Sequence, residues 1–363
     1  MRAWLEDVQA LAASCMAIRY VRCIGGPIEK GTAQGPNLKR LSHVDYLRGL
    51  AALSVLFFHA TNTVENFPIA QSIRSSGQYG RYGVEVFFVI SGFIIPYSMR
   101  VADYRFRTDI WQFVLKRFSR VEPAYAASIA FTLLIGGLVN ALYSKTIYQW
   151  SVSELLSHAF YLTSFLGYEW INPVYWTLAI EFQFYIALAF IYGAIFDRTR
   201  RVALAILCAA VFFTAGDRAQ GTVIAYIPLF TMGVMSCLAL TCSVKRSILF
   251  LMILALFLAA WWKIDLVAAS LGVITTVFII NGDRLPEMRA LRFLGLISYS
   301  IYLFHYPIVE KLVRYGKVLG PSVGAQVIVV MLSMLVSIAV SWVAYALVER
   351  PSLRISSGIK YSH

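Results

Sequence analysis

The sequence is poor in charge, and poorest in acidic residues. Charged residues make up 14% of the 363 residues, with only 19 aspartates and glutamates, whereas hydrophobic residues make up 59%. A soluble protein of this composition would expose large apolar patches, so a soluble class is excluded. The apolar residues form long runs rather than alternating with polar ones, which indicates membrane helices. We therefore expect an all-α integral membrane protein built as a single bundle.

Cysteine is also scarce, with five in the chain and no pair in C-x-x-C spacing. They lie in or near apolar segments, and an odd number at such positions indicates packing residues rather than a disulfide framework. We expect no metal site. The cysteines are Cys15, Cys23, Cys208, Cys237 and Cys242.

The beginning of the sequence shows no cleavable signal peptide. Residues 8–18 form only a weak apolar stretch, which Arg19 and Arg22 interrupt. Residues 25–40 are polar and rich in glycine and proline. We expect residues 1–42 to form a partly flexible cytoplasmic extension.

Ten apolar stretches follow, which predicts a bundle of about ten transmembrane helices over residues 43–351 and a short tail over 352–363. Residues 151–170 are too polar to span and are expected along the membrane interface. The stretches cover 44–63, 83–101, 121–143, 174–196, 202–216, 222–241, 247–262, 264–281, 291–313 and 322–348.

The net charge of +13 comes from short basic clusters between apolar runs, a pattern that argues against a nucleic-acid partner. It matches the positive-inside rule, with attraction to anionic membrane lipid as a side effect. With ten spans and a cytoplasmic N-terminus, 23 lysines and arginines lie inside and 8 outside. Both termini are therefore predicted to be cytoplasmic.

Four predicted spans contain ionisable residues, which normally face the bundle interior and indicate function. Arg48 lies about 6 Å from the cytoplasmic end of its helix, and His59 about 22 Å in. Glu85, Glu181 and His305 are expected in the outer half of the membrane with His59. Eleven steps of about 100° place Arg48 and His59 on one helix face, roughly 16 Å apart.

Less specific explanations exist for several of these residues. A buried histidine in a membrane helix often serves as an interhelical hydrogen-bond partner. Arg48 could extend to the inner interface, and Glu85 is close enough to the boundary to be solvated. The pattern S-x-x-D at Ser42 and Asp45 predicts a capped helix start.

Several motifs together resemble the membrane-bound acyltransferase 3 family, the bacterial O-acyltransferases of exopolysaccharide, lipopolysaccharide O-antigen and related glycans. The resemblance runs from residue 43 to residue 351. The matching segments are DYLRGLAALSVLFFH, YGVEVFFVISGFII, RFSRVEPAY, VYWTLAIEFQFYI, SYSIYLFHYPI and the closing ERP. Phe182 stands where a second glutamate is common, and DYLRG replaces the usual Asp-Gly-Leu-Arg-Gly.

The resemblance implies a multi-pass protein of the bacterial inner membrane that transfers an acyl group to a sugar hydroxyl. The donor is usually cytoplasmic acetyl-CoA, and the acceptor is a carbohydrate or a lipid-linked glycan. The implied catalytic pair is Arg48 and His59. The implied supporting residues are Glu85, Ser91, Arg117, Arg120, Trp176, Glu181, Tyr299 and His305.

The chemistry suggests a role for each group. Imidazole at His59 could act as general base or carry the acyl group, with Glu181 or Glu85 holding its tautomer. Arg48, helped by Arg117 and Arg120, suits the phosphates of CoA. The roughly 16 Å between Arg48 and His59 is about the length of a pantetheine arm. Alternatively, Arg117 and Arg120 could belong to a basic loop that serves only to set the membrane topology.

Two other classes remain. A proton-coupled transporter also carries intramembrane histidine and glutamate, but transporters tend to show two similar halves, which this sequence lacks. A non-catalytic subunit of a polysaccharide export machine would need no acyl-CoA site. The sequence does not separate acetyl from succinyl donors, identify the acceptor or indicate an oligomeric state.

Overall fold

The computed structural model describes residues 41–65, 67–142, 150–216, 221–242, 244–282, 285–320 and 322–361. Every regular element in this described part is helical, which confirms the all-α class. The predicted extension lies almost entirely outside the described residues. The described parts of the ten expected apolar stretches lie mostly in helices.

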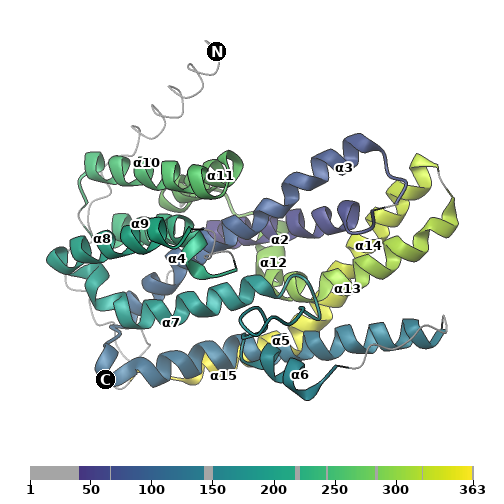
Figure 1. Ribbon diagram of the computed structural model, residues 1–363, viewed down its shortest axis with the longest axis horizontal. Helices are drawn as coiled ribbons and strands as arrows, with labels where there is room; N and C mark the ends of the chain where they lie inside the picture. The colour runs from purple at the N-terminus through teal and green to yellow at the C-terminus, as the bar shows by residue number, and fades with distance from the viewer. Residues whose placement is uncertain are drawn as a thin grey trace, which may run out of the picture.

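The long helices run mostly along the longest axis of the molecule (Figure 1). Those that match the expected stretches are α2 (Ser42–Asn62), α4 (Gly83–Val101), α5 (Phe106–Leu142), α7 (Trp176–Phe196), α8 (Arg198–Thr214), α9 (Ile227–Thr241), α10 (Arg246–Lys263), α11 (Leu266–Asn281), α13 (Ser298–Gly316) and α14 (Val323–Ala344). The shorter ones are α3 (Gln71–Gln78), η1 (Tyr79–Tyr82), α6 (Val152–Ala159), η3 (Val223–Tyr226), α12 (Arg289–Leu296), η5 (Lys317–Leu319), η6 (Tyr345–Glu349) and α15 (Arg350–Gly358).

Six helical segments within the described residues are long and apolar enough to cross a membrane: 71–101, 106–139, 176–196, 223–241, 246–263 and 323–358. Many apolar side chains on them are exposed, as a lipid-facing surface requires. On α10, for example, only Leu249 and Ala260 are buried. The protein is therefore a multi-pass membrane protein, while ten spans and two cytoplasmic termini stay predictions.

The centre of the bundle is the packing of α4 against α9 and α7. Phe230 of α9 stacks on Phe184 of α7 at 4.2 Å and lies 4.9 Å from Phe88 of α4, measured between ring centroids. The backbones of α4 and α9 approach closely at Gly92 and Gly233, where a Cβ atom would clash with the facing backbone. Small residues allow this approach between membrane helices, and it fixes α4 in the core.

Three details differ from the sequence-based expectations. The cap predicted from Ser42 and Asp45 is wrong, because the N-cap of α2 is Leu41 and no side chain caps the helix. The ninth stretch is divided at Ile297 into α12 and α13. The tail after Pro351 begins as the helix α15, which packs along α5 (Figure 1).

The segment predicted at the interface begins with α6, which Ser151 and Glu154 cap in a capping box. His158 at its end is buried and holds the following loop. Its Nδ1 atom lies 2.8 Å from the Glu154 carbonyl, and its Nε2 atom accepts the Ile171 N–H at 2.9 Å. These contacts fix the neutral ring with the proton on Nδ1, and burial lowers the pKa of His158.

Candidate active site

Helix α2 carries Arg48 towards its N-terminal end and His59 towards its C-terminal end. The helix is unbroken from Ser42 to Asn62, so Arg48 and His59 stay on one face with a rise of about 16 Å between them. α2 packs against α12 and α13. Tight packing at Gly49 and Gly295 fixes the α2–α12 contact, because a Cβ atom at either position would meet backbone.

Cationic side chains from two helices converge on one cavity of about 100 Å³. Arg48 comes from α2, and Arg117 and Arg120 come from α5. Arg48 and Arg120 make no hydrogen bond or ion pair to any other described residue. Both lie close enough to Glu181 and Glu349 to interact electrostatically with these carboxylates. Both side chains are half-buried, and a guanidinium without a partner in such a place is costly, so the cavity is suited to an anionic ligand.

Arg117 is held more firmly than the other two arginines. Its Nη2 atom donates to Ser98 Oγ at 2.9 Å, and its guanidinium lies 5.4 Å from the ring centroid of Phe113 and 5.7 Å from that of Tyr185. These cation–π contacts orient its planar group at the cavity wall. The basic segment that was expected as a loop is therefore part of the helix α5, and it contributes directly to the cavity.

Two carboxylates balance part of this charge. Glu181 of α7 accepts a hydrogen bond from Ser91 Oγ at 2.6 Å, and Glu349 accepts one from Ser300 Oγ at 2.6 Å. Both glutamates and Ser91 line the cavity. Tyr299 also lines it and donates its hydroxyl proton to the Val121 carbonyl at 3.0 Å. The structure thus places Glu181 with the arginines.

The two histidines form a second centre, outside the cavity lining. Their ring centroids lie 5.2 Å apart, and the His59 ring also meets Tyr306 edge-on at 5.1 Å. His59 Nδ1 shares a hydrogen bond of 3.1 Å with Thr63 Oγ1. The pairing of His59 with His305 connects α2 to α13.

His305 is completely buried and has a defined tautomer. Its Nδ1 atom lies 2.8 Å from the Ile301 carbonyl and 2.9 Å from the Tyr302 carbonyl, so the proton is on Nδ1. Its Nε2 atom is then a lone-pair acceptor, buried and without a hydrogen-bond partner among the described residues. Because the His305 ring lies beside the His59 ring, this acceptor could stabilise a proton on His59.

Tyr302 lies between the cavity and the histidines. Its ring is 5.8 Å from Phe87, which lines the cavity with it, and 6.1 Å from His305. Its hydroxyl is 2.6 Å from Thr177 Oγ1 and donates to the Val174 carbonyl at 3.0 Å. A ligand extending from the arginines to the histidines would pass Tyr302 and Phe87.

The two carboxylates suggested as partners of His59 lie elsewhere. Glu181 is bonded to Ser91 in the cavity, and Glu85 lies near Arg81 and Asp265. The contacts of His59 are with Phe58, Thr63, His305 and Tyr306. Trp176 lines a separate cleft beside the cavity. A histidine thus occupies the place beside His59 where a carboxylate was expected.

Glu349 is the site residue that the sequence reasoning missed. It belongs to the ERP segment that closes the family resemblance, but its role becomes visible only from its place in the cavity. It lies in η6, a π-helical turn after α14. Such turns interrupt regular helices and are frequent at functional sites.

We expect Glu349→Gln to lower the melting temperature of the ligand-free protein by about 2 to 5 °C. Glutamine can keep the bond to Ser300 but removes the charge that attracts Arg48 and Arg120. An anionic ligand would then restore more stability, so acetyl-CoA should raise the melting temperature further than in the wild type. Thermal unfolding in detergent, with and without acetyl-CoA, measures both shifts.

Glu122→Gln is the matched control. Glu122 is a half-buried carboxylate of α5 that accepts one hydroxyl hydrogen bond, from Tyr161 at 2.9 Å, and it does not line the cavity. Its substitution should leave the stabilisation by acetyl-CoA unchanged. An equal response in the two variants would contradict the role of Glu349.

Comparison with known proteins agrees with this geometry. A family model described as an acyltransferase domain, Acyl_transf_3, matches residues 41–346. The chain belongs to this acyltransferase family, and the protein is a membrane acyltransferase. Membership in the family favours the enzyme over the transporter and the export-machine subunit.

Named relatives are similar to the chain at low identity. Nodulation protein 10 of Rhizobium leguminosarum bv. viciae is 25% identical over 88% of this chain and 95% of its own length. The putative membrane-bound transacylase BcsY of Komagataeibacter xylinus is 25% identical over 86% of this chain and 83% of its own. The putative peptidoglycan O-acetyltransferase YrhL of Bacillus subtilis is 24% identical over 85% and 54%. No solved structure gives a significant match.

Proposed function

We propose that the protein transfers an acetyl group from cytoplasmic acetyl-CoA to a sugar hydroxyl of a surface or secreted glycan at the bacterial inner membrane. The observation that carries this proposal is the arrangement on α2. Arg48 lies with two further arginines in one cavity, and His59 lies about 16 Å along the same helix face beside His305. The names of relatives that modify peptidoglycan support a glycan acceptor.

The donor would bind with its phosphates on Arg48, Arg117 and Arg120. Guanidinium groups pair with phosphate oxygens through parallel hydrogen bonds, and a cavity shielded from bulk water strengthens them. The pantetheine arm would extend past Tyr302 and place the thioester near His59. The rise of about 16 Å between Arg48 and His59 is comparable to the length of this arm.

His59 would then act as general base. It takes the proton of the acceptor hydroxyl while the oxygen attacks the thioester carbonyl, the carbon–sulfur bond breaks, and the CoA thiolate recovers the proton from the imidazolium. The lone pair of His305 would stabilise the proton on His59 in between. In the alternative route His59 carries the acetyl group itself, and the acceptor attacks in a second step.

The test uses purified protein in lipid nanodiscs with radiolabelled acetyl-CoA and membrane glycan from a deletion strain. We expect binding of acetyl-CoA and transfer of label to the glycan. Mass spectrometry of surface glycans should show O-acetyl groups in the wild type and their loss in the deletion strain. Failure to bind acetyl-CoA, or an unchanged glycan in the deletion strain, would refute the proposal.

A further inference from the structure

A second hollow, the aromatic cleft, lies beside the arginine cavity at the N-terminal end of α7. Its volume is about 680 Å³, within the usual range for small-molecule sites. Aromatic side chains from three elements form its walls: Trp176 of α7, Tyr226 of η3 and Trp262 of α10. The rings of Trp176 and Tyr226 lie 6.0 Å apart, and Lys263 and Ile264 complete the rim.

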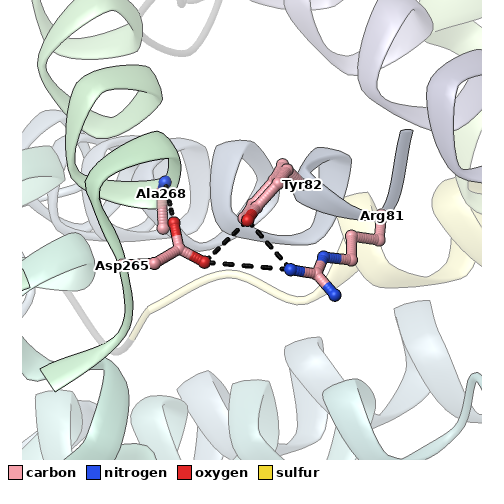
Figure 2. Close-up of polar contacts among 4 residues, drawn as sticks. All are labelled: Arg81, Tyr82, Asp265 and Ala268. Carbon is pink, nitrogen blue, oxygen red and sulfur yellow. Dashed lines mark hydrogen bonds and ion pairs between the residues drawn. The ribbon is translucent and has the colours of Figure 1, made fainter. Parts of the chain in front are cut away.

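Asp265 follows Ile264 of this rim in the sequence, and it forms a polar network with Tyr82 and Arg81 (Figure 2). Tyr82 donates its hydroxyl proton to Asp265 Oδ2 at 2.7 Å, and Arg81 Nη2 donates to the Tyr82 hydroxyl at 2.9 Å. The second oxygen of Asp265 accepts the Ala268 N–H at 2.8 Å. The side chain of Arg81 is 57% exposed, so most of its donors remain available to a ligand.

The cleft and the arginine cavity share one wall. Trp176 immediately precedes Thr177, which lines the cavity and is bonded to Tyr302. On the other side, the Tyr226 ring packs 4.8 Å from that of Phe88, a second residue of the cavity lining. A ligand in the aromatic cleft is therefore next to the path from the arginines to the histidines.

Glu85 occupies the space behind this wall. It lies close enough to Arg81, Asp265, Tyr226 and Tyr302 to interact with their charges. Its Oε2 atom is buried and has no hydrogen-bond partner among the described residues. A buried acceptor of this kind needs a donor from outside the described residues, which a water molecule or a ligand hydroxyl can supply.

Membrane proteins also carry tryptophan and tyrosine in belts at the lipid interface. Trp261 and Trp262 at the end of α10 are both exposed, by 51% and 66%, and would suit such a belt. A belt does not explain why Trp176 and Tyr226, on two other elements, face the same hollow as Trp262. Trp261 does not line it.

We propose that the aromatic cleft binds a pyranose ring of the glycan acceptor. The C–H faces of a sugar ring pack on aromatic rings, while its hydroxyls can hydrogen-bond with the charged side chains of Lys263 on the rim and of Arg81 next to it. The predicted topology places all these residues on the outer side, where a surface glycan is accessible. This inference rests on the proposed function and assigns the acceptor subsite.

The neighbouring tryptophans provide the test. In nanodiscs with the strain's own membrane glycan as acceptor, Trp262→Ala should lower kcat/KM for the glycan about tenfold. Trp261→Ala, the matched control one residue away, should stay within twofold of the wild type. The Kd for acetyl-CoA should be unchanged in both variants, which also shows that both are folded. Arg81→Gln should weaken glycan use in the same direction as Trp262→Ala.

The outcomes separate the two proposals. If the wild type transfers no acetyl group, the proposed function fails. If the wild type transfers it but Trp262→Ala and Arg81→Gln use the glycan normally, only the acceptor subsite is wrong. Equal losses in Trp261→Ala and Trp262→Ala would identify the pair as a lipid belt and overturn the subsite.

Discussion

Replacing His59 by alanine is expected to reduce acetyl transfer at least a hundredfold while leaving acetyl-CoA binding intact. A positioned general base contributes about 10² to 10⁴ in rate, and a residue that carries the acyl group contributes the whole reaction path. Binding should survive because His59 lies outside the lining of the arginine cavity. Single-turnover transfer of labelled acetyl and equilibrium binding of acetyl-CoA measure the two effects separately.

Acid quenching during the reaction distinguishes the two roles of His59. Label that stays on the wild-type protein, but not on His59→Ala, indicates an acyl carrier, and no label on either indicates a general base.

A histidine on the same helix gives the matched control for this experiment. His43 is buried and bonded to the Ile279 carbonyl at 3.1 Å, away from the site, and glutamine can keep that bond. His43→Gln should therefore transfer acetyl at nearly the wild-type rate.

In His305→Asn we expect kcat to fall about tenfold with an unchanged KM for acetyl-CoA, since only the lone pair beside His59 is lost. Near wild-type turnover of a folded His59→Ala protein would disprove its catalytic role.

Replacing Arg48 by alanine is expected to weaken acetyl-CoA binding about ten- to a hundredfold. A hydrogen bond to a charged group contributes roughly 1.5 to 3 kcal/mol, and no described residue forms a hydrogen bond or ion pair with Arg48 that would compete with a phosphate. Arg48→Lys should recover only part of the affinity, because an ammonium group cannot form the bidentate contact. Isothermal titration calorimetry with acetyl-CoA gives the dissociation constants.

A shortened donor shows whether Arg48 acts on the phosphates. S-acetylpantetheine contains the thioester but no phosphate, so Arg48→Ala should bind it as the wild type does. Arg107, an exposed arginine at the start of α5, is the control position, and Arg107→Ala should change the Kd for acetyl-CoA less than twofold. A lower kcat with an unchanged Kd would instead assign Arg48 to the thioester carbonyl.

The fold class was predictable from local pattern, and several residues of the cavity lining were predictable from motifs that resemble those of the family. Apolar runs determined the helices, and the motifs selected Arg48, Ser91, Arg117, Arg120, Glu181 and Tyr299, which the structure brings together. The helical period placed Arg48 and His59 on one face, and the structure keeps that geometry.

The neighbours of each group could not be predicted, because they depend on how helices distant in sequence rotate against one another. Depth alone placed Glu85 and Glu181 with His59. The rotation of α7 instead directs Glu181 to Ser91, and α13 brings His305 to His59. The role of Glu349 in the cavity was not predicted, because its position depends on the π-helical turn of η6. The aromatic cleft combines residues from three elements, and sequence spacing does not connect them.

The unbroken course of α2 constrains how this segment could change during evolution. One residue inserted between Arg48 and His59 would move His59 by 1.5 Å and turn it by about 100°, away from His305. Only the insertion of whole turns would restore the direction, and it would shift His59 along the axis by more than 5 Å. Except at Gly49, where a side chain would meet the backbone of α12, the residues between Arg48 and His59 should therefore tolerate apolar substitutions far better than insertions or deletions.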